Sequence, residues 1–114
     1  MKRIVVTGAT SMIGGALIEE CIKHDTEVYA VVRVSSGKQS RLLSGPKLHL
    51  VDCDLENLDC LPEKIPEKCD TFYHIAWGNT GERRNKSTEL QSRNIFYTLQ
   101  AVRAAEALGC RRFI

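Results

Sequence analysis

The chain has 114 residues, of which 43% are hydrophobic and 26% are charged, a composition typical of one soluble globular domain with its own core. Its net charge of +2 is too small to favour nucleic acid or a membrane surface as a partner. The apolar run before Thr7 covers only Ile4–Val6, far short of a signal peptide or a membrane span.

The cysteines exclude two further classes of protein. Their number is odd and none of them has C-x-x-C spacing; they are Cys21, Cys53, Cys60, Cys69 and Cys110. We therefore expect neither a disulfide framework nor a metal site, but reduced thiols in a cytoplasmic protein. Cys53, Cys60 and Cys110 have no neighbouring histidine pattern, so we do not expect them to be nucleophiles.

The first motif joins a buried strand to a helix. Ile4–Val6 has the pattern of a strand that is buried on both faces of a parallel sheet, and the small residues of Thr7–Gly15 follow directly. Gly8 can adopt the backbone angles of a tight turn, and Gly14 allows the helix to pack closely on the strand. The N–H groups at the start of this helix, helped by its dipole, can bind the pyrophosphate of a dinucleotide.

This motif leaves alternatives open. Ser11 stands where the usual three-glycine fingerprint has its middle glycine, and its hydroxyl group either donates to a phosphate or crowds the close approach of the pyrophosphate. The segment can also be an ordinary βα turn. A P-loop is excluded because no Gly-Lys-Ser or Gly-Lys-Thr follows at its spacing.

The first half of the chain predicts a helix and two more strands. The helix is expected from Met12 to His24, with one apolar face made of Ile13, Ala16, Leu17 and Cys21. The strands are expected at Glu27–Val32 and Leu48–Val51, which are rich in branched residues. The polar stretch between them has room for a short helix around Gln39–Leu43.

The second half continues this alternation. Two prolines allow only a short helix within Glu56–Lys68, and Asp70–Ala76 predicts a fourth strand. The longest periodic segment, Thr88–Leu108, predicts a helix that ends at Gly109. Its expected core face consists of Ile95, Leu99, Val102, Ala105 and Leu108. Arg111–Ile114 has the pattern of a fifth strand.

The alternation of strands and helices predicts an α/β fold, a Rossmann-like doubly wound parallel sheet with helices on both faces. The chain stops inside the fifth strand, so we expect the sheet to be truncated there. No repeat or linker divides the sequence. Residues 1–114 are therefore expected to be the N-terminal part of one dinucleotide-binding domain, without a substrate-binding part.

The order of motifs resembles the N-terminal half of the extended short-chain dehydrogenases/reductases, the NAD-dependent epimerase/dehydratase family. Thr7-Gly8-x-x-Ser11-x-x-Gly14 is similar to the family's T-G-x-x-G-x-x-G, apart from the serine. Three later segments are similar to its G-D-L, D-x-V-x-H-x-A-A and K-R-F-V motifs, namely Asp52–Leu55, Asp70–Trp77 and Arg111–Ile114. Asn94 matches the asparagine of N-x-x-G-T, although Tyr97 replaces the glycine.

The resemblance implies which residues hold the cofactor. The pyrophosphate would be bound by the turn and the first helical residues, namely Gly8, Thr10, Ser11, Met12, Ile13 and Gly14. Asp54 and Leu55 would contact the adenine, and Ala76 and Trp77 would line the ribose on the nicotinamide side. Asn94 would support the active site.

Several of these residues also have simpler interpretations. Asp54 can be a turn-forming carboxylate that caps the next segment, Asn94 can be a helix cap, and Trp77 can belong to the core. His74 lies in a strand that is predicted to be buried, where a structural histidine is more common than an acid or base.

The charge after the second strand bears on the choice of cofactor. NAD-binding proteins of this fold place Asp or Glu about 20 residues past the glycines, whereas NADP-binding ones have an arginine nearby for the 2′-phosphate. Arg33 stands at this position, followed by Ser35, Ser36 and Lys38, with no acidic residue between Val28 and Gly45. The sequence favours NADP over NAD, with a solvated basic loop as the alternative. It also argues against a methyltransferase, which generally has an acidic residue there.

The reaction of the resembled family is attributed to a Tyr-x-x-x-Lys pair, in which the lysine charge lowers the pKa of the tyrosine. None of Tyr29, Tyr73 and Tyr97 is followed by lysine at that spacing. We therefore expect the chain to be part of a longer enzyme and to be inactive alone. Its apolar edges would then be exposed unless it self-associates.

Two functions remain at this point. The resemblance implies an epimerase, dehydratase or reductase that acts on a nucleotide sugar by hydride transfer, with homodimers packed through the long helices. The alternative is a non-catalytic module that senses NADP and regulates a partner.

Overall fold

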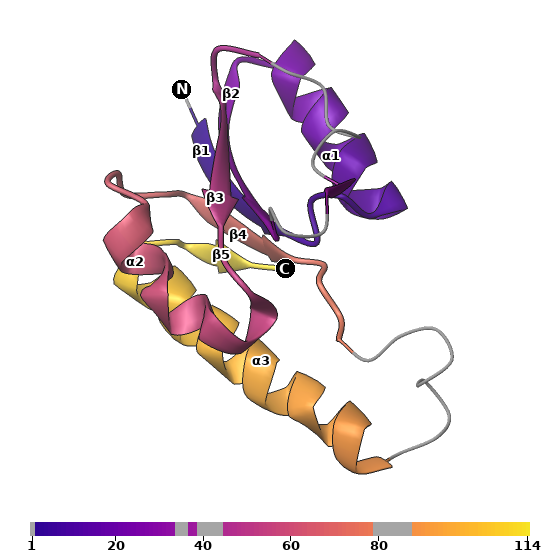
Figure 1. Ribbon diagram of the computed structural model, residues 1–114. Coiled ribbons are helices and arrows are strands. Elements are labelled where there is room, and N and C mark those ends of the chain that lie inside the picture. Colours follow the sequence, from indigo (N-terminus) through magenta and orange to yellow (C-terminus); the bar gives the residue numbers. More distant parts are fainter. Residues whose placement is uncertain (1, 34–36, 39–44, 79–87) are drawn as a thin grey trace.

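The computed structural model describes residues 2–33, 37–38, 45–78 and 88–114, in which strands and helices alternate (Figure 1). The elements are β1 (Lys2–Thr7), α1 (Met12–Lys23), β2 (Thr26–Val32), β3 (Leu48–Asp52), the 3-10 helix η3 (Leu55–Cys60), α2 (Leu61–Lys64), β4 (Thr71–His74), α3 (Thr88–Ala107) and β5 (Arg112–Phe113). These elements confirm the predicted strands and long helices. The helix expected around Gln39–Leu43 lies outside the described residues.

The strands form one parallel sheet in the order β3-β2-β1-β4-β5. The central strand pairs on both sides, with Val5 opposite Tyr29 of β2 and opposite Phe72 of β4. The chain builds the sheet outward from β1 to β3 and then returns to continue on the other side of β1. This confirms the predicted doubly wound sheet, and a ligand of such a sheet binds at the carboxyl ends of the strands where the order reverses.

Helices cover both faces of the sheet, with α1 on one face and α2 and α3 on the other (Figure 1). The side chains of β1 alternate between the two layers, because successive residues of a strand point to opposite faces. Ile4 and Val6 pack in the layer of α1, whereas Val5 packs with Phe72 in the layer of α3. The continuous apolar run at the N-terminus therefore contributes side chains to the hydrophobic cores on both faces of the sheet.

The predicted apolar face of α1 is confirmed for Leu17 and Cys21, which are partly buried against the core, and wrong for Ile13 and Ala16. Ile13 is 65% exposed and Ala16 is exposed, whereas Ile18 is 1% exposed. The buried face is centred on Gly14 and Ile18, one turn apart. The periodic pattern missed this face because Gly14 has no side chain to contribute to it.

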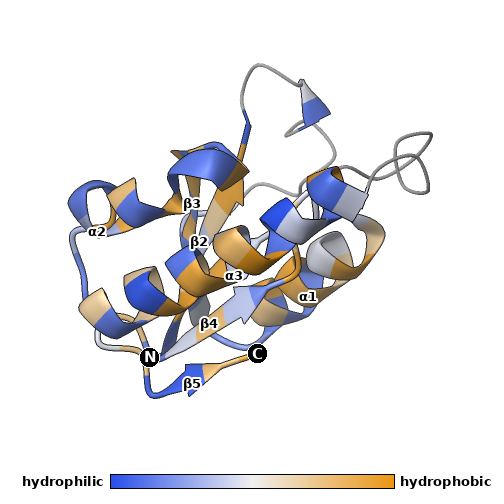
Figure 2. Ribbon diagram, turned by 90° about the horizontal axis from the view of Figure 1, so that it is seen from below, coloured by the Kyte–Doolittle hydropathy of each residue, from blue (hydrophilic) through white to orange (hydrophobic). Residues whose placement is uncertain are grey.

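The predicted core face of α3 is also wrong in its first half. Ile95, Leu99 and Val102 are exposed, and only Ala105 and Leu108 of the expected set are buried. The helix instead packs on the sheet with small or polar residues, namely Asn94, Tyr97, Ala101, Ala104 and Ala105. Figure 2 views the molecule from this side and shows hydrophobic segments along α3.

Within the described ranges, no helix has both the length and the apolar character needed to cross a bilayer.

The buried face of α1 gives a test by paired substitutions. We expect Ile18→Ala to lower the free energy of unfolding by about 2–5 kcal/mol, because it removes a fully buried side chain and leaves a cavity. Ile13→Ala, which changes the same residue type at an exposed position, should change it by less than about 0.5 kcal/mol. Chemical denaturation followed by circular dichroism measures both, and equal losses would contradict the observed face.

Candidate functional site

The turn after β1 requires a glycine at position 8. Gly8 has a φ of +70°, in the left-handed region that favours glycine. It also lies against the segment that follows β4, because a Cβ at this position would be 2.7 Å from the backbone nitrogen of Ala76. The turn and the end of β4 are thus packed backbone to backbone at the point where the strand order reverses.

Gly14 allows α1 to begin directly on this turn. A Cβ at Gly14 would collide with the carbonyl oxygen of Gly8. At Gly15, by contrast, a Cβ would lie 3.9 Å from the nearest atom, the carbonyl oxygen of Ala9, an ordinary contact. The first turn of α1 is therefore held against the end of β1 by the absence of one side chain.

Ser11 is the N-cap of α1. Its Oγ accepts a hydrogen bond from the N–H of Gly14 at 3.1 Å and donates one to the carbonyl oxygen of Gly8 at 2.6 Å. The hydroxyl group thus braces the turn from within. Met12 and Ile13 begin the helix with exposed side chains, and the N–H groups of a first helical turn have no partner inside the helix. The positive end of α1 is open to an anion there, with Thr10 half-buried beside it.

A second set of contacts fixes the end of β4. Thr7 is buried, and its Oγ1 lies 2.8 Å from Nδ1 of His74 and accepts a hydrogen bond from the N–H of Ala76 at 3.3 Å. Burial lowers the pKa of His74, which favours the neutral ring. The hydrogen bond to Thr7 supports the expectation of a structural histidine.

Asn94 holds the segment after β4 from the side of α3. The side chain is buried, accepts a hydrogen bond from the N–H of Gly78 at 2.7 Å and donates one to the carbonyl oxygen of Gly78 at 3.0 Å. Asn94 lies inside α3 and is therefore not the helix cap of the alternative interpretation. No feature of the sequence indicated Gly78 as its partner, because the two residues are far apart in the chain.

Trp77 lies on the surface next to this clamp. It is 56% exposed, and its Nε1 donates a hydrogen bond to Oε1 of Gln91 at 3.2 Å. The alternative that Trp77 belongs to the core is therefore wrong. Ala76 and Trp77 lie between the two anchored residues, His74 and Gly78, so their backbone is fixed at both ends.

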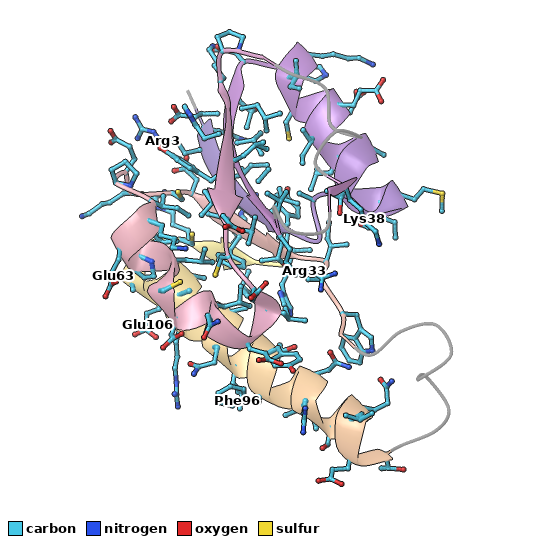
Figure 3. The ribbon with its side chains drawn as sticks, viewed as in Figure 1. Arg3, Arg33, Lys38, Glu63, Phe96 and Glu106 are labelled. Carbon is cyan, nitrogen blue, oxygen red and sulfur yellow. The ribbon has the colours of Figure 1, made fainter. Side chains whose placement is uncertain are left out.

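The ends of β2 and β3 complete this edge of the sheet. The N–H of Cys53 donates to the carbonyl oxygen of Val32 at 3.0 Å, which holds the two strand ends together. Arg33 follows β2 directly and is exposed, as is Lys38; Figure 3 shows both at this end of the molecule, away from Arg3. Ser35 and Ser36 lie outside the described residues.

Asp54 and Leu55 follow β3 and differ in exposure. Asp54 is exposed and precedes η3, but its carboxylate makes no capping hydrogen bond, and the N–H of Asn57 bonds to its backbone oxygen instead. Leu55 is half-buried and packs against the core on the side of α3. The interpretation of Asp54 as a side-chain cap is therefore wrong.

The structure brings all the predicted site residues that it describes to the carboxyl edge of the sheet.

Comparisons with known proteins agree with this geometry. The model of the NAD dependent epimerase/dehydratase family matches residues 4–114. No curated protein matches the chain.

Solved structures share the fold. The enzyme WbmH of Bordetella bronchiseptica in complex with NAD+ is 19% identical over 99% of this chain and 37% of its own, with a TM-score of 0.80. UDP-glucose 4-epimerase of Thermotoga maritima with UDP-glucose is 18% identical over 97% and 36%, with a TM-score of 0.79. A UDP-galactose 4-epimerase is 27% identical over 97% and 36%, with a TM-score of 0.75. The chain spans little more than a third of the length of these structures.

The two adjacent glycines at the start of α1 provide a matched test of the site. We expect Gly14→Ala to destabilise the protein by about 1–3 kcal/mol, because the new methyl group collides with the carbonyl oxygen of Gly8. Gly15→Ala should be neutral or stabilising by up to about 1 kcal/mol, because alanine is the better helix former and has space. Thermal unfolding of both variants measures the difference, and the reverse order would contradict the close packing.

Proposed function

Because the chain belongs to the NAD dependent epimerase/dehydratase family, we propose that its carboxyl sheet edge binds a nicotinamide dinucleotide. The observation that carries this proposal is the contact between Gly8 and Gly14, which places the start of α1 on the end of β1. A side chain at either glycine would collide with neighbouring backbone, so the turn keeps this close approach. It lies at the reversal of strand order, where dinucleotides bind in doubly wound sheets.

Each part of the cofactor then has a complementary group. In this proposal the pyrophosphate lies over the open helix start, with Gly8, Thr10, Met12, Ile13 and Gly14 around it. Ser11 contributes by bracing the turn, since its hydroxyl group bonds to both glycines. The exposed carboxylate of Asp54 receives the adenine amino group, and Leu55 packs beside the ring.

The remaining contacts concern the nicotinamide side. Ala76 and Trp77 line the ribose there, and Asn94 is a positioning residue that acts through Gly78. When bound, the oxidised nicotinamide ring would accept a hydride and the reduced ring would donate one. The role of this chain is to hold that ring at a fixed edge of the sheet.

We further propose NADP as the preferred cofactor. Arg33 and Lys38 are exposed after β2, where the 2′-phosphate of the adenine ribose is expected. A guanidinium group suits phosphate because it donates several hydrogen bonds in a planar arrangement. WbmH, one of the structures of this fold, is in complex with NAD+. For this chain we expect tighter binding of NADP+ than of NAD+.

The reaction that we propose is hydride transfer on a nucleotide sugar, in an epimerase, dehydratase or reductase of the cytoplasm. The family supports this class, and so do the UDP-sugar epimerases among the structures of the same fold. The chain alone would bind the dinucleotide without turnover, because none of its tyrosines is followed by lysine four residues on. If the full reading frame also lacks this pair, a non-catalytic NADP-sensing module becomes the better proposal.

The cofactor proposal is tested by calorimetric titration of the chain with NADP+ and NAD+. We expect Arg33→Ala to weaken NADP+ binding by about tenfold or more, since a hydrogen bond to a charged group contributes about 1.5–3 kcal/mol. NAD+ binding should change little, because NAD+ has no 2′-phosphate. Arg111→Ala is the matched control, since Arg111 precedes β5 and lies at the opposite edge of the sheet.

Two outcomes would contradict this assignment. Equal weakening of both dinucleotides by Arg33→Ala would show that the arginine does not recognise the 2′-phosphate. Absence of binding of either dinucleotide to the wild-type chain would contradict the cofactor site itself.

The proposed homodimer rests on the outer face of α3. Four exposed apolar side chains form what we call the α3 stripe, namely Ile95, Phe96, Leu99 and Val102. Figure 3 shows Phe96 on the outer side of this helix. A helix face of this kind on a soluble protein is a common contact between subunits. A second copy of the chain, packed helix against helix, is the partner that we propose.

This interface predicts a monomer when a charge is placed in the α3 stripe. We expect Leu99→Glu to abolish dimers, because Leu99 is 54% exposed in the chain alone and would become buried in the interface. Ala16→Glu is the control, since it places the same charge on the exposed part of α1. Sedimentation velocity measures the association state. A wild-type chain that stays monomeric at high concentration would contradict the interface.

A further inference from the structure

Two cysteine thiols lie in contact beside the proposed adenine site. Cys53 follows β3 and Cys60 ends η3, and their sulfur atoms are 3.4 Å apart. The turn of η3 brings them together although they do not have C-x-x-C spacing. Nothing in the sequence indicated this contact between the two thiols.

The two thiols differ in their exposure to solvent. Cys53 is 6% exposed, and its Sγ lies 3.2 Å from the carbonyl oxygen of Asn57. Cys60 is half-buried. Both line a hollow of about 430 Å³ together with Asp54, Asp59 and Lys64, which a small molecule can enter. Cys60 is thus the more exposed of the two thiols and the one that we expect a reagent to meet first.

The other cysteines have no such arrangement. Cys21 lies on α1, on the other face of the sheet, and the Sγ of Cys69 lies 3.6 Å from the carbonyl oxygen of Glu67. The structure describes all five cysteines, and the sulfur atoms of Cys53 and Cys60 are the two that lie within hydrogen-bond distance of each other. Burial raises the pKa of the Cys69 thiol, and Cys110 lies near enough to add to this rise, but the sulfur atoms in direct contact are those of Cys53 and Cys60.

We propose that Cys53 and Cys60 form a reversible disulfide with a low-molecular-weight disulfide as the oxidant. The thiolate of Cys60 attacks one sulfur of the oxidant, so that one S–S bond forms as another breaks, and the released thiolate takes up the proton that Cys60 lost. The sulfur of Cys53 then attacks that of Cys60 and releases a second small thiol, which takes up the proton of Cys53. Two protein thiols are oxidised and the oxidant is reduced to two thiols.

The geometry favours the second step over a lasting mixed disulfide. The two sulfur atoms are already in contact before the first step, so the sulfur of Cys53 lies beside any mixed disulfide formed on Cys60. Burial raises the pKa of the Cys53 thiol to about 12, which leaves the first attack to Cys60. A disulfide bond needs the two sulfur atoms about 2.05 Å apart. They must therefore approach from 3.4 Å, which a small shift of residues 54–59 can provide.

This shift would affect dinucleotide binding, an inference that rests on the proposed function. The loop that moves contains Asp54 and Leu55, the proposed adenine contacts. Leu55 also lies near Gly78, the residue that Asn94 clamps, since its Cδ2 is 3.3 Å from a Cβ built there. Oxidation would therefore displace the adenine contacts and weaken dinucleotide binding, by about fivefold or more for a coupling of ordinary size.

The disulfide itself is tested by mass spectrometry on the whole chain after incubation with oxidised glutathione. We expect a loss of two hydrogen atoms that dithiothreitol reverses. Trypsin leaves both cysteines in the peptide 48–64, and cleavage after Glu56 then yields two pieces that stay joined only by the disulfide. Cys21→Ser should behave as the wild type, whereas Cys60→Ser should give no joined pieces. Any other pairing, or a glutathione adduct on Cys60 that does not close, would overturn the proposal.

The consequence is tested by titrating reduced and oxidised wild type with the dinucleotide. We expect weaker binding after oxidation, and the same treatment of Cys60→Ser should leave its affinity unchanged. Equal affinity of both wild-type forms would overturn the coupling to the cofactor site. A reduced chain that binds no dinucleotide would instead contradict the proposed function, and the mass measurement would still decide whether the disulfide forms.

Discussion

The contact between Gly14 and the carbonyl oxygen of Gly8 is the constraint on which the rest of this structure depends. It sets the start of α1 directly on the end of β1, and Ile18 then reaches the sheet one turn later. The same contact leaves the positive end of the helix open at the reversal of strand order. One missing side chain thus determines both the packing of a layer and the place where an anion can bind.

The segment after β4 depends on this turn and also links the two layers of helices. Its backbone touches Gly8 on one side, and Asn94 of α3 holds Gly78 by two hydrogen bonds on the other. A buried amide is costly unless it is paired, and here the pairing is complete only when the segment takes this path. The position of Trp77 is therefore a consequence of contacts made by its neighbours.

The strands and the start of α1 could be predicted from the sequence because each depends on local chemistry, an apolar run or a glycine in a turn. The faces of α1 and α3 could not be predicted in full, because their buried residues include Gly14, Ala101 and Ala104, which add little to a hydrophobic pattern. The residues of the site were likewise predictable in part. Its residues at strand ends were placed by order along the chain, whereas the partner of Asn94 and the contact of Cys53 with Cys60 arise from tertiary packing.

The loops at the carboxyl edge are held by three different means, which should respond differently to change. Backbone packing at Gly8 resists any side chain, so this turn is rigid and specific for glycine. The clamp at Gly78 depends on one side chain and would be lost with it. The loop after β3 is held in part by weak contacts of thiols, whose bonding can change without a mutation. Of the three, the loop that carries Asp54 is the one whose geometry can respond to the surroundings of the protein.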